Sequence, residues 1–549
     1  MSEGVSPPPA AAAANNPLLE RVGNALRAGD VASAKAAARE ALASGLEHPL
    51  LLNLRALTYE DAGEFEKALA DLRRAHVLSP KDFAILNACG LCLARLERYE
   101  EALQCYEQAL ALRPEYSQAW FNRAYVLERL GETAKAAESY TKAVELMPEH
   151  VMAWASMAAL AARRGDVAKT REYAERALAL EPGQGTATLA LVEIEMSDPP
   201  VAEKRVREFL AAGGFGEFDH ALALGHLGDI LNAQGRTVEA FAAYTESNNL
   251  FRKEAKPRFE GPGQTTVADA LRWMLRWARA QPPKASREAG VSTAASESRH
   301  VFLVGFPRSG TTLVESMLTG HPDVVSLEER STLQASVRAW MTDPTAISRL
   351  MKASDAELKP YREDYWSRVK GFGCEPDGKI FIDKNPFNSL KLPLIQRLFP
   401  DAKVIFAIRD PRDVVLSCFR RRFNLNPSIY ELLDLRRAAA LYDGTMGFAE
   451  AFRSAFPFEE HRIVYERFVA DFTAESQDLC AFIGADWRDD LLQFADRAKR
   501  GDVASASSAQ IARGLYADGA GQWRRYRDQL APVLPLLAPW VERFGYPAD

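Results

Sequence analysis

Two patterns of hydrophobic and polar positions divide the chain. Between about residues 16 and 255, apolar residues recur at helical spacing in segments that repeat along the sequence. Beyond residue 299 they form short continuous runs, such as VFLV at 301–304 and VIFAI at 404–408, each followed by a turn and a helix-like segment. The first pattern predicts an all-α array, and the second predicts an α/β domain.

The repeated segments have a period of 34 residues, clearest in the prolines that close them: Pro80, Pro114, Pro148 and Pro182. Small and aromatic residues keep fixed places in each period: Gly90, Ala102, Tyr106 and Ala109 in one unit, and Ala124, Ala136, Tyr140 and Ala143 in the next. This pattern resembles the tetratricopeptide repeat. The resemblance implies a solenoid of stacked helix pairs, with a concave face of the kind that binds a protein or peptide.

The repeat pattern weakens before it ends. Thr170 stands where the second helix should have Ala, and residues 183–219 are irregular, before a clear unit returns with Gly228, Ala240 and Tyr244. We therefore expect a flexible tail at 1–15 and a solenoid at 16–255. A Pro-, Ser- and Ala-rich linker with one short helix should follow at 256–298, and the second domain should occupy 299–549.

The most informative segment of the second domain is VFLVGFPRSGTTLVESML at 301–318, a strand-like run followed by a loop and a helix start. Such a loop directs backbone N–H groups and the positive end of a helix at one place, which suits a phosphate or sulfate group. The Lys of an ATP or GTP loop is missing, because Gly310 is followed by Thr311 and Thr312, and Arg308 stands earlier. The missing Lys disfavours a nucleotide kinase.

A second strand-and-helix segment, VIFAIRDPRDVVLSCFRRRF at 404–423, carries Arg409 at the strand end and Ser417 eight residues later, and VYERF follows at 464–468. The three segments together resemble sulfotransferases that use 3′-phosphoadenosine 5′-phosphosulfate (PAPS). The resemblance implies an α/β, P-loop-like domain with a parallel sheet. It also implies that Arg308, Ser309, Gly310, Thr311 and Thr312 hold the 5′ end of the nucleotide, while Arg409 and Ser417 hold the 3′-phosphate.

Three further segments are similar to tyrosylprotein sulfotransferases. GHPDVVSLEERSTL implies that Glu329, rather than Glu328 beside it, is the catalytic base, and KIFIDKNPFNSL implies that Lys384 neutralises charge on the leaving phosphate oxygen with Arg308. Asn385 stands where that family commonly has Asp. In QIARGLYADGAGQW, the resemblance assigns Arg513 and Gly514 to the 3′-phosphate and Trp523 to packing.

Composition narrows these expectations. A net charge of −6 gives no general attraction to nucleic acid, so an anion site must be a local basic pocket. Six scattered cysteines favour a reducing, cytoplasmic setting, and no apolar run approaches the length of a membrane span. No cluster of His and Cys residues indicates a metal site.

The sequence therefore favours a PAPS-dependent sulfotransferase whose acceptor is a hydroxyl, with tyrosine of a protein or peptide held by the repeat array as the first choice. A carbohydrate or small-molecule acceptor fits the same nucleotide site. The alternative is a repeat scaffold whose α/β domain binds a nucleotide without catalysis. The sequence leaves a homodimer open.

Overall fold

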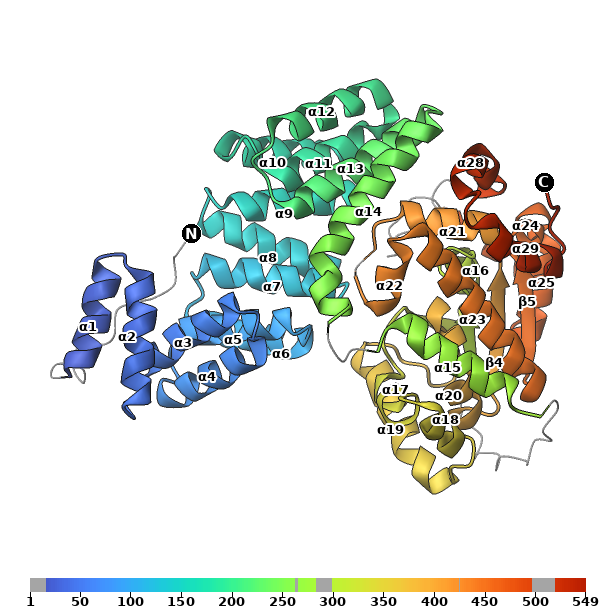
Figure 1. Ribbon diagram of the computed structural model, residues 1–549, viewed down its shortest axis with the longest axis horizontal. Helices are drawn as coiled ribbons and strands as arrows, with labels where there is room; N and C mark the ends of the chain where they lie inside the picture. Colours follow the sequence, from blue (N-terminus) through green and yellow to red (C-terminus); the bar gives the residue numbers. More distant parts are fainter. Residues whose placement is uncertain (1–15, 262–264, 283–298, 424, 496–518) are drawn as a thin grey trace. The chain divides into compact units, whose positions relative to one another are not determined.

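The computed structural model describes residues 16–261, 265–282, 299–423, 425–495 and 519–549 (Figure 1). By its contacts, the chain divides into two compact units after Phe215. Unit 1 ends at that residue, and unit 2 runs from Gly216 to Asp549.

The described part of unit 1 is helical, and each helix packs against the next one in sequence. Its α-helices are α1 (Pro17–Arg27), α2 (Val31–Ala43), α3 (Pro49–Asp61), α4 (Phe65–Leu78), α5 (Phe83–Arg95), α6 (Tyr99–Leu112), α7 (Ser117–Arg129), α8 (Thr133–Leu146), α9 (Val151–Arg163), α10 (Val167–Leu180), α11 (Gly185–Ile194) and α12 (Pro199–Ala212). The predicted array of helical repeats is confirmed.

Local sequence explains where these helices start and how they pair. The Asp82 side chain accepts a hydrogen bond from the N–H of Ala84, which caps the start of α5. Within the pair α5–α6, a Cβ on Gly90 would lie 2.6 Å from the ring of Tyr106. The small residue of the repeat pattern is therefore needed because the tyrosine of the second helix lies directly against the first helix.

Unit 2 begins with α13 (Glu217–Ala233), α14 (Thr237–Phe259) and α15 (Val267–Arg279). The α/β elements follow: β1 (Arg299–Val304), α16 (Thr311–Leu318), β2 (Val324–Glu328), α17 (Gln334–Trp340), α18 (Pro344–Leu350), α19 (Asp355–Gly371), β3 (Ile380–Lys384), η2 (Pro386–Lys391), α20 (Leu392–Leu398), β4 (Lys403–Ile408), α21 (Pro411–Arg420), α22 (Pro427–Leu432), α23 (Leu435–Ala455), β5 (Glu460–Val464), α24 (Tyr465–Ala470), α25 (Phe472–Ile483), η3 (Asp489–Gln493), η5 (Gln522–Tyr526), α28 (Arg527–Leu530) and α29 (Leu534–Arg543).

The strands form one sheet in the order β2-β3-β1-β4-β5, and every neighbouring pair is parallel. The predicted α/β domain with a parallel sheet is thereby confirmed. Lys384, at the end of β3, lies opposite Leu303 of β1 on one side and Glu328 of β2 on the other. This register brings the carboxyl ends of three strands together, where ligands bind in open α/β sheets.

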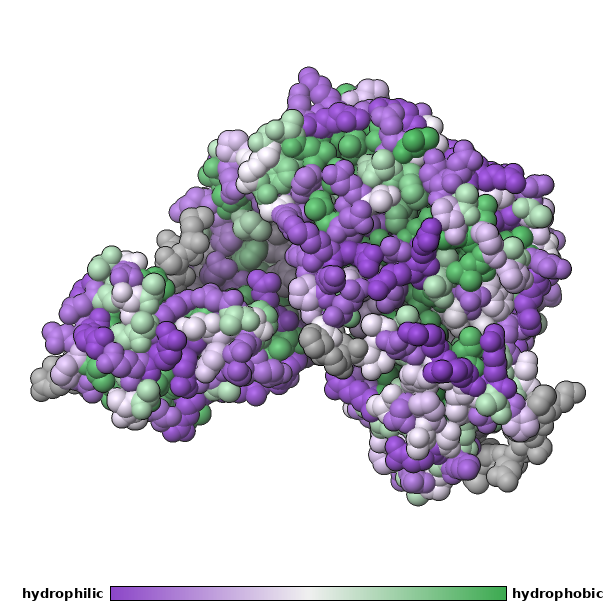
Figure 2. Space-filling model, in the orientation of Figure 1, coloured by the Kyte–Doolittle hydropathy of each residue, from purple (hydrophilic) through white to green (hydrophobic). Residues whose placement is uncertain are grey.

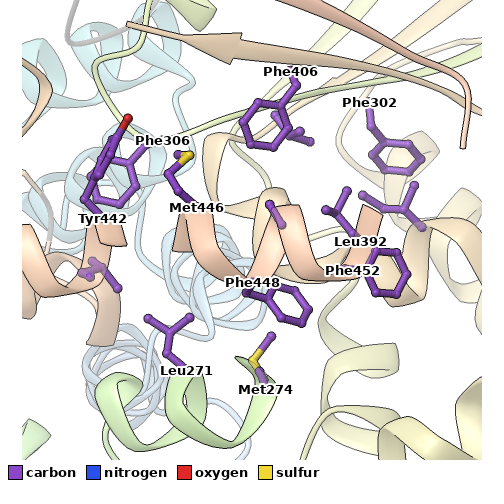
Figure 3. Packing of buried hydrophobic residues seen from close by; sticks show 14 of the residues in the cluster. Leu271, Met274, Phe302, Phe306, Leu392, Phe406, Tyr442, Met446, Phe448 and Phe452 are labelled. Atoms are coloured by element: carbon purple, nitrogen blue, oxygen red, sulfur yellow. The ribbon is translucent and has the colours of Figure 1, made fainter. Parts of the chain in front are cut away.

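Side chains of alternate strand residues pack into two hydrophobic cores, one on each face of the sheet. Phe302 and Phe406 pack on one face with α15 and α23, as Figure 3 shows for Met274 and Phe448. On the other face, Leu303 packs among residues of α16 and α25. Because both faces are covered, the strands read as continuous apolar runs in the sequence.

Helix α15 lies within the stretch expected to be a linker, and it belongs to the core of unit 2. Leu271, Met274 and Trp277 are buried in that core, and the indole Nε1 of Trp277 donates to Ser348 Oγ at 2.9 Å. Helices α13 and α14 keep the repeat pattern but group with unit 2, so the contact boundary lies before the expected end of the solenoid. The domain limits read from the repeat period remain a prediction.

Hydrophilic residues cover much of the face drawn in Figure 2, with apolar areas among them. Among the helices in the described ranges, none is both long and apolar enough to cross a membrane.

Candidate active site

The loop between β1 and α16 needs glycine at both ends. A Cβ on Gly305 would lie 2.6 Å from the carbonyl oxygen of Ala407, and one on Gly310 would lie 2.6 Å from the ring of Tyr465. Gly310 also has a φ of 96°, which side chains rarely adopt. The loop therefore lies tightly against β4 and the residue that follows β5.

Helix α16 starts directly after this loop. Ser309 and Thr311 are buried, Thr312 is half-buried, and the N–H of Ser309 donates to the carbonyl oxygen of Phe306 at 3.1 Å. The first turn of a helix leaves N–H groups without partners inside the helix. The expected anion-binding residues from Ser309 to Thr312 thus form the tight turn and the first residues of a helix.

The structure brings Arg308, Arg409 and Ser417 together, although about a hundred residues separate the first from the other two. The Nε of Arg308 donates to Ser417 Oγ at 3.0 Å, and the Nη1 of Arg409 donates to the carbonyl oxygen of Arg308 at 3.1 Å. Helix α21 makes this contact, because it starts at Pro411 and carries Ser417 in its second turn. Two sequence segments therefore form one cationic corner.

Arg409 is a buried cation whose hydrogen-bond acceptors are backbone carbonyl oxygens. Its side chain stacks 4.6 Å from the ring centre of Tyr465, and its Nη2 donates to the carbonyl oxygen of Gly519. Among the described residues, its buried Nε has no hydrogen-bond acceptor. A buried guanidinium with a spare donor suits an anion.

Lys384 is fully buried at the end of β3 and lies between two carboxylates. Its Nζ is 3.0 Å from Glu329 Oε1 and 3.2 Å from Glu315 Oε2. Burial acts to lower the pKa of Lys384, but Glu315 and Glu329 outweigh burial and raise it above its ordinary value. Lys384 is therefore a charged ammonium at neutral pH.

Glu329 directly follows β2 and is the solvent-exposed partner of Lys384. Its side chain is 57% exposed, and its N–H donates to the carbonyl oxygen of Lys384 at 2.7 Å. Its φ is 37°, in the left-handed region, as is the φ of 70° at Arg308. In the described chain, Glu97 is the one other non-glycine residue with a positive φ, so two of the three strained positions are candidate site residues.

Sequence reasoning missed Glu315, on α16, and the role of Asp413, on α21. Asp413 accepts hydrogen bonds from the N–H groups of Gly521, at 2.5 Å, and Trp523, at 2.8 Å. Burial raises the pKa of Asp413 to about 6, although Arg409 and the two N–H donors act to lower it. Asp413 thereby fixes the segment whose Gly519 carbonyl contacts Arg409.

Trp523 and the RDPRD motif at 409–413 lie in contact with each other. Trp523 is buried as expected, with the guanidinium of Arg412 3.8 Å from the centre of its ring. The second Asp of the RDPRD motif, Asp413, was the available signal for this contact, but the motif alone reads as a turn. Arg513 and Gly514 lie outside the described residues.

The Sulfotransferase family model matches residues 300–489, and the tetratricopeptide repeat model matches 19–83, 90–149 and 187–247. An uncharacterized protein of Aquifex aeolicus (strain VF5) is 28% identical over 262 residues, which are 45% of this chain and 33% of that protein. Protein-tyrosine sulfotransferase A of Caenorhabditis elegans is 24% identical over 259 residues, 45% of this chain and 67% of that enzyme.

Among solved structures, a tetratricopeptide repeat protein from Parabacteroides merdae ATCC 43184 is 20% identical with a TM-score of 0.36, over 42% of this chain and 91% of that one. The chain thus matches a third of the length of the Aquifex relative and about two thirds of the nematode enzyme. Residues 300–489 therefore form a domain of the sulfotransferase family, in a chain that also carries tetratricopeptide repeats.

Proposed function

We propose that this protein transfers a sulfuryl group from PAPS to the hydroxyl of an acceptor. One observation carries the proposal: a cationic corner of Arg308, Arg409 and Ser417 and the ion pair of Lys384 with Glu329 both lie at the carboxyl edge of the parallel sheet. The first group suits the phosphates of a nucleotide, and the second suits charge neutralisation and proton uptake.

The residues of the cationic corner fit an anionic nucleotide. Arg308 and the loop from Ser309 to Thr312 would hold the 5′ end, and Arg409 and Ser417 would hold the 3′-phosphate. The buried Nε of Arg409 supports this assignment, because within the described ranges it has no acceptor from the protein. Arg513 and Gly514 stay proposed ligands of the same phosphate.

Lys384 and Glu329 would divide the chemistry between them. When bound, PAPS supplies the sulfuryl group on a phosphate leaving group. The ammonium of Lys384 would stabilise negative charge on that phosphate oxygen, with Arg308 beside it. Glu329 would accept the proton of the acceptor hydroxyl as the new S–O bond forms, and its exposed side chain can meet an acceptor from solvent.

The acceptor we favour is a tyrosine of a protein or peptide, because of the similarity to a protein-tyrosine sulfotransferase and the presence of the repeats. Within unit 1, a hollow of about 620 Å³ lies on α7 and α8. It is lined by an aromatic ring and by charges of both signs, among them Trp120, Arg123, Glu138 and Lys142. Such a surface suits an amphipathic peptide partner.

Thermal unfolding with adenosine 3′,5′-bisphosphate, ATP, GTP or no ligand tests the nucleotide site, in the absence of added metal. The bisphosphate alone should stabilise the protein, by about 2.7 kcal/mol at a hundred times its Kd. Arg409→Ala should weaken its affinity at least about tenfold, because a charged contact to phosphate is lost. Arg488→Ala, which changes an exposed arginine paired with Asp490, is the matched control.

A transfer assay with labelled PAPS and a tyrosine peptide then tests the chemistry. Glu329→Gln should leave bisphosphate affinity unchanged and slow transfer about a hundredfold or more. No stabilisation of the unmodified protein by the bisphosphate at saturation would favour the scaffold alternative. Binding without transfer to any hydroxyl would favour a nucleotide-binding domain that is catalytically inactive.

A further inference from the structure

The buried carboxylate of Glu315 is neither the base nor the charge-neutralising group of the proposed reaction. It lies on α16, five residues after Gly310, with its side chain only 4% exposed. A buried carboxylate is costly unless it is paired, so its position needs a physical reason. Its two contacts supply that reason.

Glu315 is held from two sides. Ser326 of β2 donates its hydroxyl to Glu315 Oε1 at 2.5 Å, and the ammonium of Lys384 lies 3.2 Å from Glu315 Oε2. The two carboxylates that flank Lys384 therefore differ in setting. Glu315 is enclosed and fixed by a second bond, whereas Glu329 is largely exposed.

The difference between Glu315 and Glu329 becomes important when the acceptor hydroxyl gives up its proton. In the proposed reaction, the acceptor O–H bond breaks and its proton passes to Glu329, while the electron pair of the broken S–O bond stays on the phosphate oxygen. A neutral Glu329 no longer holds Lys384 electrostatically, and the ammonium must then stay charged and in place. Of its two carboxylate partners, Glu315 is the one that does not take part in this proton transfer.

We propose that Glu315 is a positioning residue for sulfuryl transfer, acting as the lasting counter-ion that holds the Lys384 ammonium while Glu329 takes up the acceptor proton. The inference rests on the proposed function, since it assigns a role beside the proposed base and lysine. In this role Glu315 acts through its contact with Lys384.

The groups around Glu315 predict a pH signature. It faces Lys384 of β3 and Ser326 and Glu328 of β2. Burial raises the pKa of Glu315 to about 7, although Lys384 acts to lower it. A pKa raised to about 7 predicts that Glu315 gains its proton between pH 8 and pH 6, and glutamine should resemble the neutral form.

The test compares the unmodified protein with Glu315→Gln at pH 6 and pH 8. At pH 8 the substitution removes a buried negative charge, so adenosine 3′,5′-bisphosphate should bind about tenfold more tightly. Transfer should meanwhile slow about tenfold, because Lys384 is no longer fixed. At pH 6 the differences in bisphosphate affinity and in transfer rate between the two proteins should both be smaller. Protonation of the nucleotide affects both proteins equally, so it does not contribute to these differences.

Glu363→Gln, an exposed change on α19, is the matched control and should alter neither quantity. Weaker bisphosphate binding in Glu315→Gln would overturn the inference, since a merely structural role loses affinity. Unchanged binding and transfer at pH 8 would also overturn it. If the variant does not fold, Ser326→Ala is the second test: it should slow transfer about threefold and keep bisphosphate affinity, and an unchanged rate would overturn the inference.

Lys384→Met separates this inference from the proposed function. Full transfer activity in that variant would overturn the role of the lysine and the inference together. Loss of activity in Lys384→Met, combined with normal behaviour of Glu315→Gln, would overturn only the counter-ion role.

Discussion

The helix pairs α5–α6 and α13–α14 follow the same repeat pattern in two different settings. In each, a glycine of the first helix lies against a tyrosine of the second: a Cβ on Gly90 would lie 2.6 Å from Tyr106, and one on Gly228 would lie 2.5 Å from Tyr244. The first pair lies in unit 1, among other repeats, whereas the second packs on elements of the sulfotransferase domain. The repeat pattern thus specifies how a helix pair forms but not what it packs against.

The helix pair α13–α14 contacts the end of α21, the helix that carries the proposed phosphate ligand Ser417. Asp229 forms an ion pair of 2.7 Å with Arg422, and the side-chain amide of Asn248 donates to the carbonyl oxygen of Phe419 at 2.8 Å. Phe419 lies two residues beyond Ser417 in α21. The helix pair α13–α14 therefore supports the end of the helix that carries Ser417.

Of the substitutions that test this difference between the two helix pairs, Asp229→Ala should have the largest effect on stability and on bisphosphate affinity. The change leaves Arg422 and the hydroxyl of Tyr244 without that carboxylate, and should lower the free energy of unfolding of unit 2 by about 3 kcal/mol. Bisphosphate affinity should fall about tenfold, because α21 loses support. Asp71→Ala, which removes the partner of Arg55 in unit 1, should destabilise unit 1 without changing that affinity.

The pH dependence of the same variant gives a further check. Burial acts to raise the pKa of Asp229, but Arg422 and Arg421 outweigh burial and lower it to about 2. A lowered pKa contributes stability above the unfolded pKa of about 4 and loses it as the pH falls toward 2. The gap in unfolding free energy between the two proteins should be constant above about pH 4 and narrow below it. A gap independent of pH would contradict the ion pair.

A smaller effect is expected from adding one methyl group to either glycine. Gly228→Ala and Gly90→Ala should each lower the unfolding free energy by about 2 kcal/mol, because the tyrosine ring must move. Only Gly228→Ala should also weaken bisphosphate binding, by about threefold. Denaturant unfolding and ligand titration measure the two quantities, and equal effects of both variants on affinity would contradict the comparison.

The smallest effect is expected from Asn248→Ala, which removes one buried hydrogen bond to α21. The unfolding free energy should fall by about 1 kcal/mol, with a small loss of bisphosphate affinity. Ser117→Ala removes a comparable bond, from a hydroxyl to the carbonyl oxygen of Ala143 in unit 1, at a similar cost in stability. A change of affinity in Ser117→Ala would show that the two regions do not differ in this respect.

Much of this architecture could be predicted from local patterns. The 34-residue period follows from packing each helix pair on the next, and the runs VFLV and VIFAI follow from strands covered on both faces. Arg308 and Arg409 could be placed together because each follows a strand of a parallel sheet, which gathers its loops at one edge, whereas Ser417 is added through the resemblance to sulfotransferases.

The rest depends on contacts that no spacing encodes. Glu315 reads as an ordinary helix residue in LVESML, and its burial depends on β3 placing Lys384 beside α16. Nothing in the arginine run at 420–422 indicates its partners: Arg420 lies over the rings of Tyr244 and Tyr526, and Arg422 pairs with Asp229. Both cases require knowing which distant element lies opposite.

The left-handed backbone at Arg308 and Glu329 has a consequence for protein engineering. Glycine adopts such a conformation without strain, so replacing either residue with glycine would relieve strain while removing a candidate functional group. Backbone conformation alone therefore gives no reason for Arg or Glu at these positions, whereas the contacts of their side chains with Ser417 and Lys384 do. Glu97, with a φ of 59° at the end of α5, offers the same relief at a position remote in sequence from the candidate residues.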